Sequence, residues 1–413
     1  MMINRCGGAS RLRVCRASRP VFQAARRCPN SQPETAALRL SADWSCTRRL
    51  APDTPRSYIA PVIDTEQKLA AFLPKFRAAS WVAVDTEADS LHAYPEKVCL
   101  IQISTVAGDA LIDPLSSINL DPVLDALSGH ELIMHGADYD LRLLEKHHQF
   151  TPSTIFDTML ASRLIGERQF GYSTLVEKFL GMKLEKGPQK ANWALRPLTE
   201  RMAQYARNDT HYLKPLADKL RAGLEMKGRL AWHQESCARL ITECTRPRPA
   251  DTDGMWRVKG SHLLGRSALA ILRELWQWRE NEAIATNRPP FFVLSHDAMV
   301  GVAAAAATQR PIETYLPRNF SERRRVGLAK AIADGLRIAP DKLPKVLQRS
   351  NHRPTEAERK RFLELQKRRD AHAHQLGIDP TLIASRGTLS DLARNWEKYV
   401  GDLMNWQREL LAK

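Results

Sequence analysis

Four short apolar runs, all between residues 81 and 135, constrain the fold of this 413-residue chain more than any other feature. Apolar runs of this length that end in turn residues predict buried β-strands. They cover residues 81–85, 98–104, 110–113 and 132–135. Helical patterns surround them, at residues 65–73, 138–147, 156–165, 173–180 and 198–219. This order predicts an α+β domain in which helices flank a mixed sheet.

The second half of the chain has a different pattern. Residues 245–261 are polar and contain Pro247, Pro249 and Gly254, so we interpret them as a linker. All later patterns are helical, at residues 265–282, 295–308, 321–336, 355–376 and 388–411. We therefore predict an α+β domain over residues 58–244 and two all-α modules over residues 262–345 and 352–413.

The first 57 residues form a separate block. They contain eleven Arg, no Lys and three acidic residues, so they supply half of the net charge of +16. Low acidity with many Arg and Ser is also typical of organelle transit peptides, but we favour a disordered basic extension or translated sequence upstream of the true start. The basic excess of the whole chain favours a nucleic acid as partner over a membrane surface.

Composition excludes several classes of protein. No apolar run approaches the ~18 residues of a membrane span. The seven cysteines include no CxxC pair, which argues against a disulfide scaffold and against the common zinc ribbons. We therefore expect a cytoplasmic protein with no membrane partner.

Four carboxylates and one tyrosine carry the candidate chemistry. Asp85 and Glu87 lie two residues apart at the end of the first predicted strand, so their side chains leave the same face. Asp140 lies in the first turn of the helix after the fourth strand. Tyr205 and Asp209 are four residues apart and project from one helix face. Such oxygen ligands suit Mg²⁺ or Mn²⁺, and two such ions can activate water and neutralise the leaving oxygen of a phosphodiester.

Three motifs contain these residues. They are Val84-Asp85-Thr86-Glu87, His135-Gly136-Ala137-Asp138-Tyr139-Asp140 and Tyr205-Ala206-Arg207-Asn208-Asp209. In this order they resemble the exonuclease motifs of ribonuclease D, in the DEDDy family of 3′→5′ exonucleases. The resemblance covers residues 60–220 and continues in residues 112–115, 156–158 and 193–201. It implies an exonuclease domain of the ribonuclease H-like type.

The resemblance also implies a role for each residue. Four carboxylates would hold two divalent ions, Mg²⁺ or Mn²⁺: Asp85, Glu87, Asp140 and Asp209. Asp85 would bridge both ions. Tyr205 would orient the attacking water, because a phenol that titrates near pH ~10 is a poor base at neutral pH. The related histidine class has its histidine five residues before the last aspartate, where this chain has Gln204, so the chain belongs with the tyrosine class.

Three neighbouring acids have structural interpretations. Asp138 competes with Asp140 as the ligand of the second motif, but it is better placed as a helix N-cap. Asp157 precedes a helical pattern and is interpreted as another cap. Asp113 precedes a proline and is interpreted as a turn residue.

Four further residues are candidates for contact with the nucleic acid: Gln102, His135, Trp193 and Arg196. Trp193 and Arg196 could stack on a terminal base and pair with a phosphate. Core packing is the alternative for Trp193, hydrogen-bonded structure for His135, and a polar sheet edge for Gln102.

The helical half resembles a second family. Residues 269–279 and Arg288-Pro289-Pro290-Phe291, followed by a third helix, resemble the HRDC domain shared by RecQ-type helicases and ribonuclease D. Residues 355–413 resemble a degenerate copy, through residues 377–380 and 382–386. The copy is rich in basic residues, namely Lys360, Arg361, Lys367, Arg368, Arg369 and Arg386. They form either a solvated face or part of an electrostatic funnel for a single strand.

We predict a metal-dependent 3′-5′ exoribonuclease that releases nucleoside 5′-monophosphates and acts in tRNA 3′ processing. By resemblance, its partners are precursor tRNAs and other structured small RNAs with single-stranded 3′ ends, and we expect a monomer. One alternative is a DNA 3′-5′ exonuclease, because contacts to the 2′-hydroxyl are not visible in a sequence. The other is a non-catalytic RNA-binding protein, against which the four intact carboxylates argue.

Overall fold

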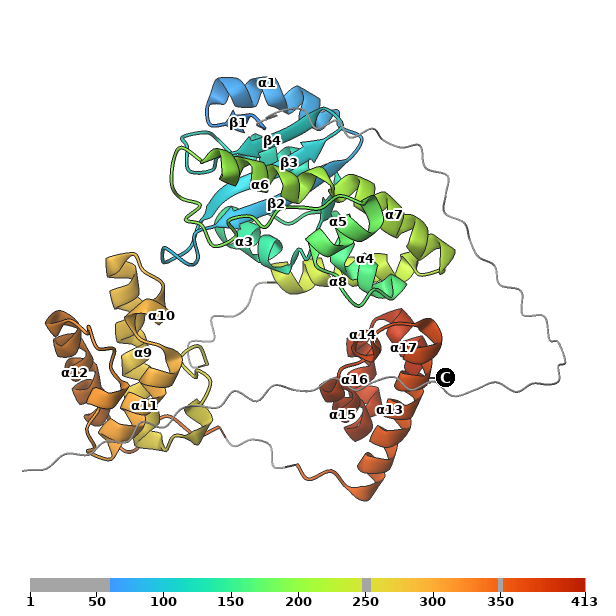
Figure 1. The fold of residues 1–413 in the computed structure, drawn as a ribbon. Helices are drawn as coiled ribbons and strands as arrows, with labels where there is room; N and C mark the ends of the chain where they lie inside the picture. Colours follow the sequence, from blue (N-terminus) through green and yellow to red (C-terminus); the bar gives the residue numbers. More distant parts are fainter. Residues whose placement is uncertain (1–59, 247–253, 348–351, 413) are drawn as a thin grey trace, which may run out of the picture. The chain divides into compact units, whose positions relative to one another are not determined.

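The computed structural model describes residues 60–246, 254–347 and 352–412 (Figure 1). The predicted N-terminal extension, residues 1–57, lies outside the described residues, as does the centre of the predicted linker. The elements of the first part are β1 (Val62–Ile63), α1 (Glu66–Arg77), β2 (Val82–Ala88), β3 (Val98–Thr105), β4 (Gly108–Ile112), α2 (Asp121–Ser128), β5 (Glu131–Met134), α3 (Asp138–His148), β6 (Thr154–Asp157), α4 (Thr158–Ile165), α5 (Tyr172–Leu180), α6 (Glu200–His211), α7 (Leu213–Met226) and α8 (Leu230–Thr245).

The six strands form one mixed sheet in the order β1-β4-β3-β2-β5-β6 (Figure 1). β3 runs antiparallel to β2 and β4, whereas the pairs β1–β4, β2–β5 and β5–β6 are parallel. β2 therefore lies inside the sheet, with hydrogen-bonded neighbours on both sides. The predicted mixed sheet with flanking helices is confirmed.

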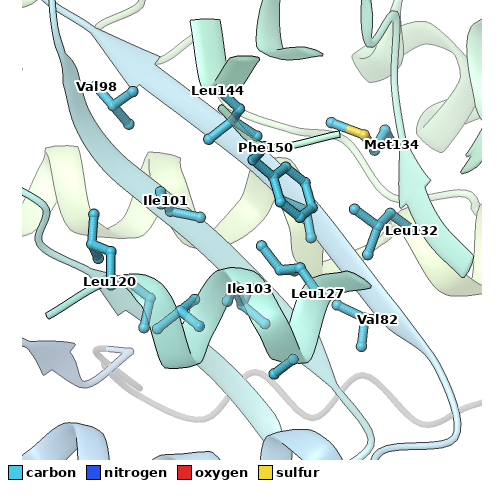
Figure 2. Packing of buried hydrophobic residues seen from close by; sticks show 14 of the residues in the cluster. Val82, Val98, Ile101, Ile103, Leu120, Leu127, Leu132, Met134, Leu144 and Phe150 are labelled. Atoms are coloured by element: carbon cyan, nitrogen blue, oxygen red, sulfur yellow. The ribbon is translucent and has the colours of Figure 1, made fainter. Parts of the chain in front are cut away.

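Side chains of a strand alternate between the two faces of the sheet, and this alternation decides which residues of β2 reach the site. Val82 and Ile103 face a core that also includes residues of α1, α2, α3 and α8 (Figure 2). Ala83 faces the opposite core, with residues of α4, α5 and α7. Asp85 and Glu87 follow Ala83 at intervals of two and lie on its face.

The helix predicted over residues 156–165 begins later than predicted, at Thr158. Thr154–Asp157 is strand β6, whose Ile155 pairs in parallel with Leu132 of β5. Asp157 then caps α4, because its side chain accepts hydrogen bonds from the backbone N–H groups of Met159 and Leu160. The short apolar segment before the cap is buried in the sheet, and the helical pattern begins only after it.

The helix predicted over residues 198–219 is divided in two. α6 ends at His211 and α7 begins at Leu213, with Tyr212 between them. Pro215 lies in the first turn of α7, where its missing N–H does not interrupt a helix, whereas in the interior of one long helix it would. Strand β1 and helices α2 and α8 were not predicted.

The remaining described residues are helical. They form η1 (Ser261–Leu263), α9 (Arg266–Thr286), α10 (Pro290–Val293), α11 (His296–Ala307), η2 (Glu313–Tyr315), α12 (Glu322–Leu336), α13 (Glu356–Leu376), α14 (Pro380–Ile383), α15 (Arg386–Arg394), α16 (Trp396–Tyr399), η3 (Val400–Asp402) and α17 (Asn405–Ala412). The predicted helix over residues 388–411 is thus broken, and Asn395 at the break caps α16. The domain boundaries themselves remain predictions. No helix within the described ranges combines the length and apolar character needed to cross a bilayer.

Candidate active site and metal centre

The carboxyl end of β2 faces a cavity of about 910 Å³, and four acidic residues of the predicted motifs are among the residues that line it. Asp85 and Glu87 come from β2, Asp140 from α3 and Asp209 from α6. Carboxylate oxygens of Asp85, Glu87 and Asp209 all lie within 4.8 Å of one another. The fold therefore brings the acids of all three motifs to one cavity.

Thr86 holds the carboxylate of Asp140 beside this cluster. Its backbone N–H and its hydroxyl both donate hydrogen bonds to Asp140 Oδ1, at 3.2 and 2.5 Å. The chain can enter α3 directly after β5 because Gly136 has a φ of 69°, in the left-handed region that favours glycine. The two hydrogen bonds from Thr86 to Asp140 link the second motif to the first.

Helix α6 is fixed to the sheet by a buried acid. Asp109 of β4 forms an ion pair with Arg207 at 2.8 Å, and its carboxylate also lies 2.9 Å from Nδ1 of His211. The two basic residues are four apart and so anchor one face of α6. Tyr205 and Asp209 project from a different face into the cavity, and the phenol lies close enough to the Asp209 carboxylate to lower its pKa, against the larger effect of burial.

Burial raises the pKa of each of these four motif carboxyls, Asp85, Glu87, Asp140 and Asp209. The pKa of Asp140 rises to about 6, that of Asp209 to about 7 and that of Glu87 to about 9. The pKa of Asp85 is also raised well above its ordinary value, by burial first and then by the charges of Asp140, Asp209 and Glu87. Within the described ranges, none of these four acids forms an ion pair with a basic side chain. A divalent cation would relieve this repulsion, and carboxylate oxygens are the ligands that such hard cations prefer.

Comparison with known proteins adds an independent observation. Residues 61–225 match the 3′-5′ exonuclease family, and residues 268–310 match the HRDC domain. Ribonuclease D of Jannaschia sp. is 30% identical over 366 residues, which are 85% of this chain and 92% of that protein. Ribonuclease D of Granulibacter bethesdensis is 29% identical over 363 residues, 85% of this chain and 90% of that protein. The chain belongs to the ribonuclease D family.

Solved structures agree with this assignment. The crystal structure of Escherichia coli RNase D has a TM-score of 0.69 and 24% identity, over 86% of this chain and 96% of that one, which shows a common fold. The catalytic core of RRP6 from Trypanosoma brucei has a TM-score of 0.56 and 26% identity, over 67% and 78%. This ribonuclease D-family protein is thus a 3′-5′ exonuclease, with a candidate metal site at Asp85, Glu87 and Asp209.

The structure separates the four residues expected to contact the nucleic acid. Only His135 lines the cavity, where its Nδ1 lies 2.9 Å from the hydroxyl of Thr158 and burial lowers its pKa. Trp193 is 1% exposed and packs in the core, as its structural alternative requires. Gln102 is fully buried opposite Asp85 in the strand register.

Arg196 is occupied by protein contacts in this ribonuclease D-family enzyme. Its Nε and Nη2 lie 2.6 and 2.7 Å from the two carboxylate oxygens of Asp113, and it also donates to three backbone carbonyls. Asp113 accepts in addition from the N–H of Leu115, in the turn that the sequence indicated. The guanidinium therefore holds the segment before α6 against the sheet.

The other two acids of the motif region also have structural partners. Asp157 caps α4 as predicted, and its second oxygen accepts a hydrogen bond from the N–H of Ala137. The prediction that Asp138 caps α3 is wrong, because Ala137 is the N-cap residue. The backbone N–H of Ala137 donates its hydrogen bond to Asp157. Asp138 instead pairs with Arg142 on the surface of α3.

Sequence analysis missed one wall of the cavity. The segment before α6 contributes Lys183, Leu184, Glu185, Lys186, Gly187 and Gln189. The segment is a loop without helical or strand periodicity, so no pattern marked it. Its charged residues, Lys183, Glu185 and Lys186, were the only available signal.

Proposed function

We propose that this exonuclease hydrolyses RNA from the 3′-hydroxyl end by a two-metal-ion mechanism and releases nucleoside 5′-monophosphates. Its substrates would be precursor tRNAs and other structured small RNAs with single-stranded 3′ ends, processed by a monomer in the cytoplasm. The observation that carries the proposal is the group of carboxylates that share one cavity without a basic partner among the described residues. The ribonuclease D relatives support RNA as the substrate.

The donor set of the cavity fits divalent ions. Asp85, Glu87 and Asp209 would hold them with their clustered oxygens, and Asp140 would join from the side where Thr86 orients it. When bound, Mg²⁺ or Mn²⁺ would supply an activated water and neutralise the leaving oxygen. Deprotonated carboxylates are required for this binding, so the raised pKa values make metal affinity increase with pH.

Tyr205 acts as a positioning donor in this mechanism. Burial and the Asp209 charge raise the pKa of its phenol far above its ordinary value of 10, so the hydroxyl keeps its proton at neutral pH. A protonated phenol can donate a hydrogen bond and hold a water beside Asp209, whereas it is unavailable as a base.

Two surfaces offer positive charge to the RNA. Lys183 and Lys186 line the catalytic cavity. In the C-terminal helical part, a groove of about 520 Å³ between α13 and α15 is lined by Arg359, Arg386 and Arg394. A half-buried aromatic ring at the base of this groove, Phe362, lies 6.0 Å from the Arg386 guanidinium. Exposed guanidinium groups beside an aromatic ring suit the phosphates and bases of a single strand.

Three of the basic residues expected to form a surface on the C-terminal helical part have partners within the protein. Arg361, Arg368 and Arg369 each donate to a backbone carbonyl, of Ala393, Leu411 and Ala384. These three guanidinium groups hold the helices together. The groove arginines named above are therefore the better candidates for RNA contact.

The first experiment compares matched RNA and DNA oligomers, labelled at the 5′ end and carrying a single-stranded 3′ end. We expect the RNA to shorten stepwise from its 3′ end with Mg²⁺ and to stay intact with excess chelator. Faster cleavage of the DNA would favour the DNA exonuclease. Binding without metal-dependent cleavage would favour the non-catalytic protein.

The second experiment tests the groove. Arg359→Gln and Arg394→Gln together should raise KM about 3- to 10-fold on a structured precursor RNA and leave kcat unchanged on a short oligomer, because each removes a phosphate contact. The control is Arg337→Gln, at the exposed arginine that caps the C-terminus of α12. An equal rise in KM for the control would remove the groove from the proposal.

A further inference from the structure

The backbone of Gly187 lies directly against the ring of Tyr205. A methyl group added at the Gly187 Cα would overlap with three ring atoms of Tyr205, namely Cδ2, Cε2 and Cγ. The φ of Gly187 is outside the left-handed region, so the backbone conformation itself would accept alanine. The glycine is therefore required by the neighbouring ring and not by the turn.

Contacts on both sides of Gly187 hold the loop in place. The carbonyl of Lys186 accepts a hydrogen bond from Arg201 at 3.3 Å. The carbonyl of Lys190 lies 2.9 Å from His92 Nε2. A loop held at the residue before Gly187 and again three residues after it has little freedom to move away from the ring.

The same loop reaches the phenol from a second direction. The side chain of Gln189 lines the cavity beside the Tyr205 phenol and interacts with it. The ring also contacts the buried Trp193, with centroids 6.1 Å apart. Ring and hydroxyl are thus both held by the segment before α6, outside the helix that carries Tyr205.

We propose that Gly187 is a positioning residue for Tyr205: its bare backbone sets the ring orientation that directs the hydroxyl to Asp209. This inference rests on the proposed function, because orientation matters only if Tyr205 takes part in hydrolysis. Lys183, Glu185 and Lys186 of the same loop line the cavity. An RNA end that contacts these side chains therefore touches the element that orients the tyrosine.

Gly187→Ala tests the proposal with the full chain, Mg²⁺ and a short single-stranded RNA. We expect kcat to fall about 10- to 100-fold, because a shift of about 1 Å in a catalytic group has an effect of this size, while KM changes less than about twofold. The control is Gly129→Ala, in a loop of the same domain, where the added methyl would meet its nearest neighbour at an ordinary 3.5 Å. Unchanged kcat in Gly187→Ala would overturn the proposal.

A double-mutant cycle separates positioning from a general disturbance of the loop. In a Tyr205→Phe background the hydroxyl is absent, so Gly187→Ala should lower kcat by less than about twofold further. An equal loss in both backgrounds would show that Gly187 acts without Tyr205. If Gly187→Ala does not fold, Gln189→Leu removes the second loop contact without adding volume, and the same cycle applies.

A spectroscopic measurement needs no activity. The chain has eight tyrosines, and incorporation of 3-fluorotyrosine gives each a ¹⁹F resonance, with that of Tyr205 identified by its loss in Tyr205→Phe. Gly187→Ala should shift this resonance and Gly129→Ala should not. If the wild-type chain cleaves no RNA but the resonance shifts, the proposed function fails and the packing inference stands. An unshifted resonance would refute the packing inference itself.

Discussion

Two groups of acidic residues lie in the same exonuclease fold and differ in whether a basic side chain accompanies them. The paired acids are Asp89, Asp109 and Asp113, which contact Lys97, Arg207 with His211, and Arg196. The unpaired acids are Asp85, Glu87, Asp140 and Asp209, which share the cavity. All three paired acids are less than 10% exposed, whereas Asp85, Glu87 and Asp209 are half-buried, so deeper burial does not mark the unpaired group.

The partner of each acid explains its role. A buried carboxylate with its own cation has a satisfied charge and serves to hold two elements together. Asp109 holds α6 to the sheet, and its pKa is lowered by hydrogen bonds from His211 and Ser104 although burial opposes them. The unpaired acids have raised pKa values, because no cation offsets their burial. Their arrangement is unfavourable for the protein alone and favourable once a metal binds.

The largest effect that this comparison predicts is on catalysis. Under the proposed two-metal mechanism, Asp85→Asn should lower kcat by about 10³-fold or more, because it would remove a ligand oxygen charge from the site that stabilises the transition state. RNA affinity should change little. Single-turnover cleavage and a binding titration measure the two quantities.

Asp138→Asn is the matched control, since Asp138 belongs to the same set of motifs but pairs with Arg142 outside the cavity. Its kcat should stay within about twofold of wild type. Asp85→Asn with nearly normal turnover in a clean preparation would contradict the distinction between the two groups.

The second prediction concerns stability. Asp113→Ala should lower the free energy of unfolding by about 2–4 kcal/mol, because it leaves the guanidinium of Arg196 without its carboxylate. Urea unfolding measures the change. The double variant Asp113→Ala with Arg196→Met should recover part of the lost stability, because it also removes the unpaired guanidinium. If Asp113→Ala alone is as stable as wild type, the ion pair between Asp113 and Arg196 does not stabilise the fold.

Sequence analysis could find the unpaired acids because their motifs are local. Asp85 and Glu87 follow a run of apolar residues, and Tyr205 and Asp209 have helical spacing, so a few neighbouring positions define each motif. The mixed sheet was predictable for the same reason, since each strand is a short apolar run. Strand β6 was not, because its few residues adjoin a strong helical pattern.

The ion pairs of the buried acids could not be predicted from the sequence, because each pair joins residues that are far apart in the chain. Arg196 and Asp113 are 83 residues apart, and His211 and Asp109 are 102 apart. Arg196 therefore looked available for a phosphate until the structure placed it beside Asp113. The close contact of Gly187 with Tyr205 was hidden for the same reason, in a loop without periodicity.

The third prediction is a pH dependence of the metal-free protein. Asp209 has a folded pKa of about 7 and Asp140 of about 6, both above their unfolded value of about 4. Between these values the native state binds more protons than the unfolded state, so this contribution to stability is present below pH ~4 and is lost as pH rises to about 7. Each group contributes at most about 1.4 kcal/mol per pH unit.

The difference between wild type and Asp209→Asn isolates this effect from the other titrating groups. In chelator, the melting temperature of wild type relative to the variant should fall as pH rises from 5 to 8. Saturating Mg²⁺ should weaken the trend, because the bound ion stabilises the ionised carboxylates. A constant difference at all pH values would mean that Asp209 titrates normally.

The smallest expected effect is a change in the stability of the metal-free protein, and its sign should differ between the unpaired and the paired acids. Glu87→Gln should raise the stability of the metal-free protein by about 1 kcal/mol at pH 7, because glutamine removes a carboxyl whose pKa is raised to about 9 by burial and by Asp209. Asp109→Asn should lower stability by a similar amount or more, because it removes the buried carboxylate charge that Arg207 and His211 both contact. Both substitutions replace a carboxylate by its amide, so the difference in sign reports only the surroundings. Urea unfolding in chelator measures both, and a loss of stability in Glu87→Gln would show that Glu87 has a structural partner and belongs with the paired acids.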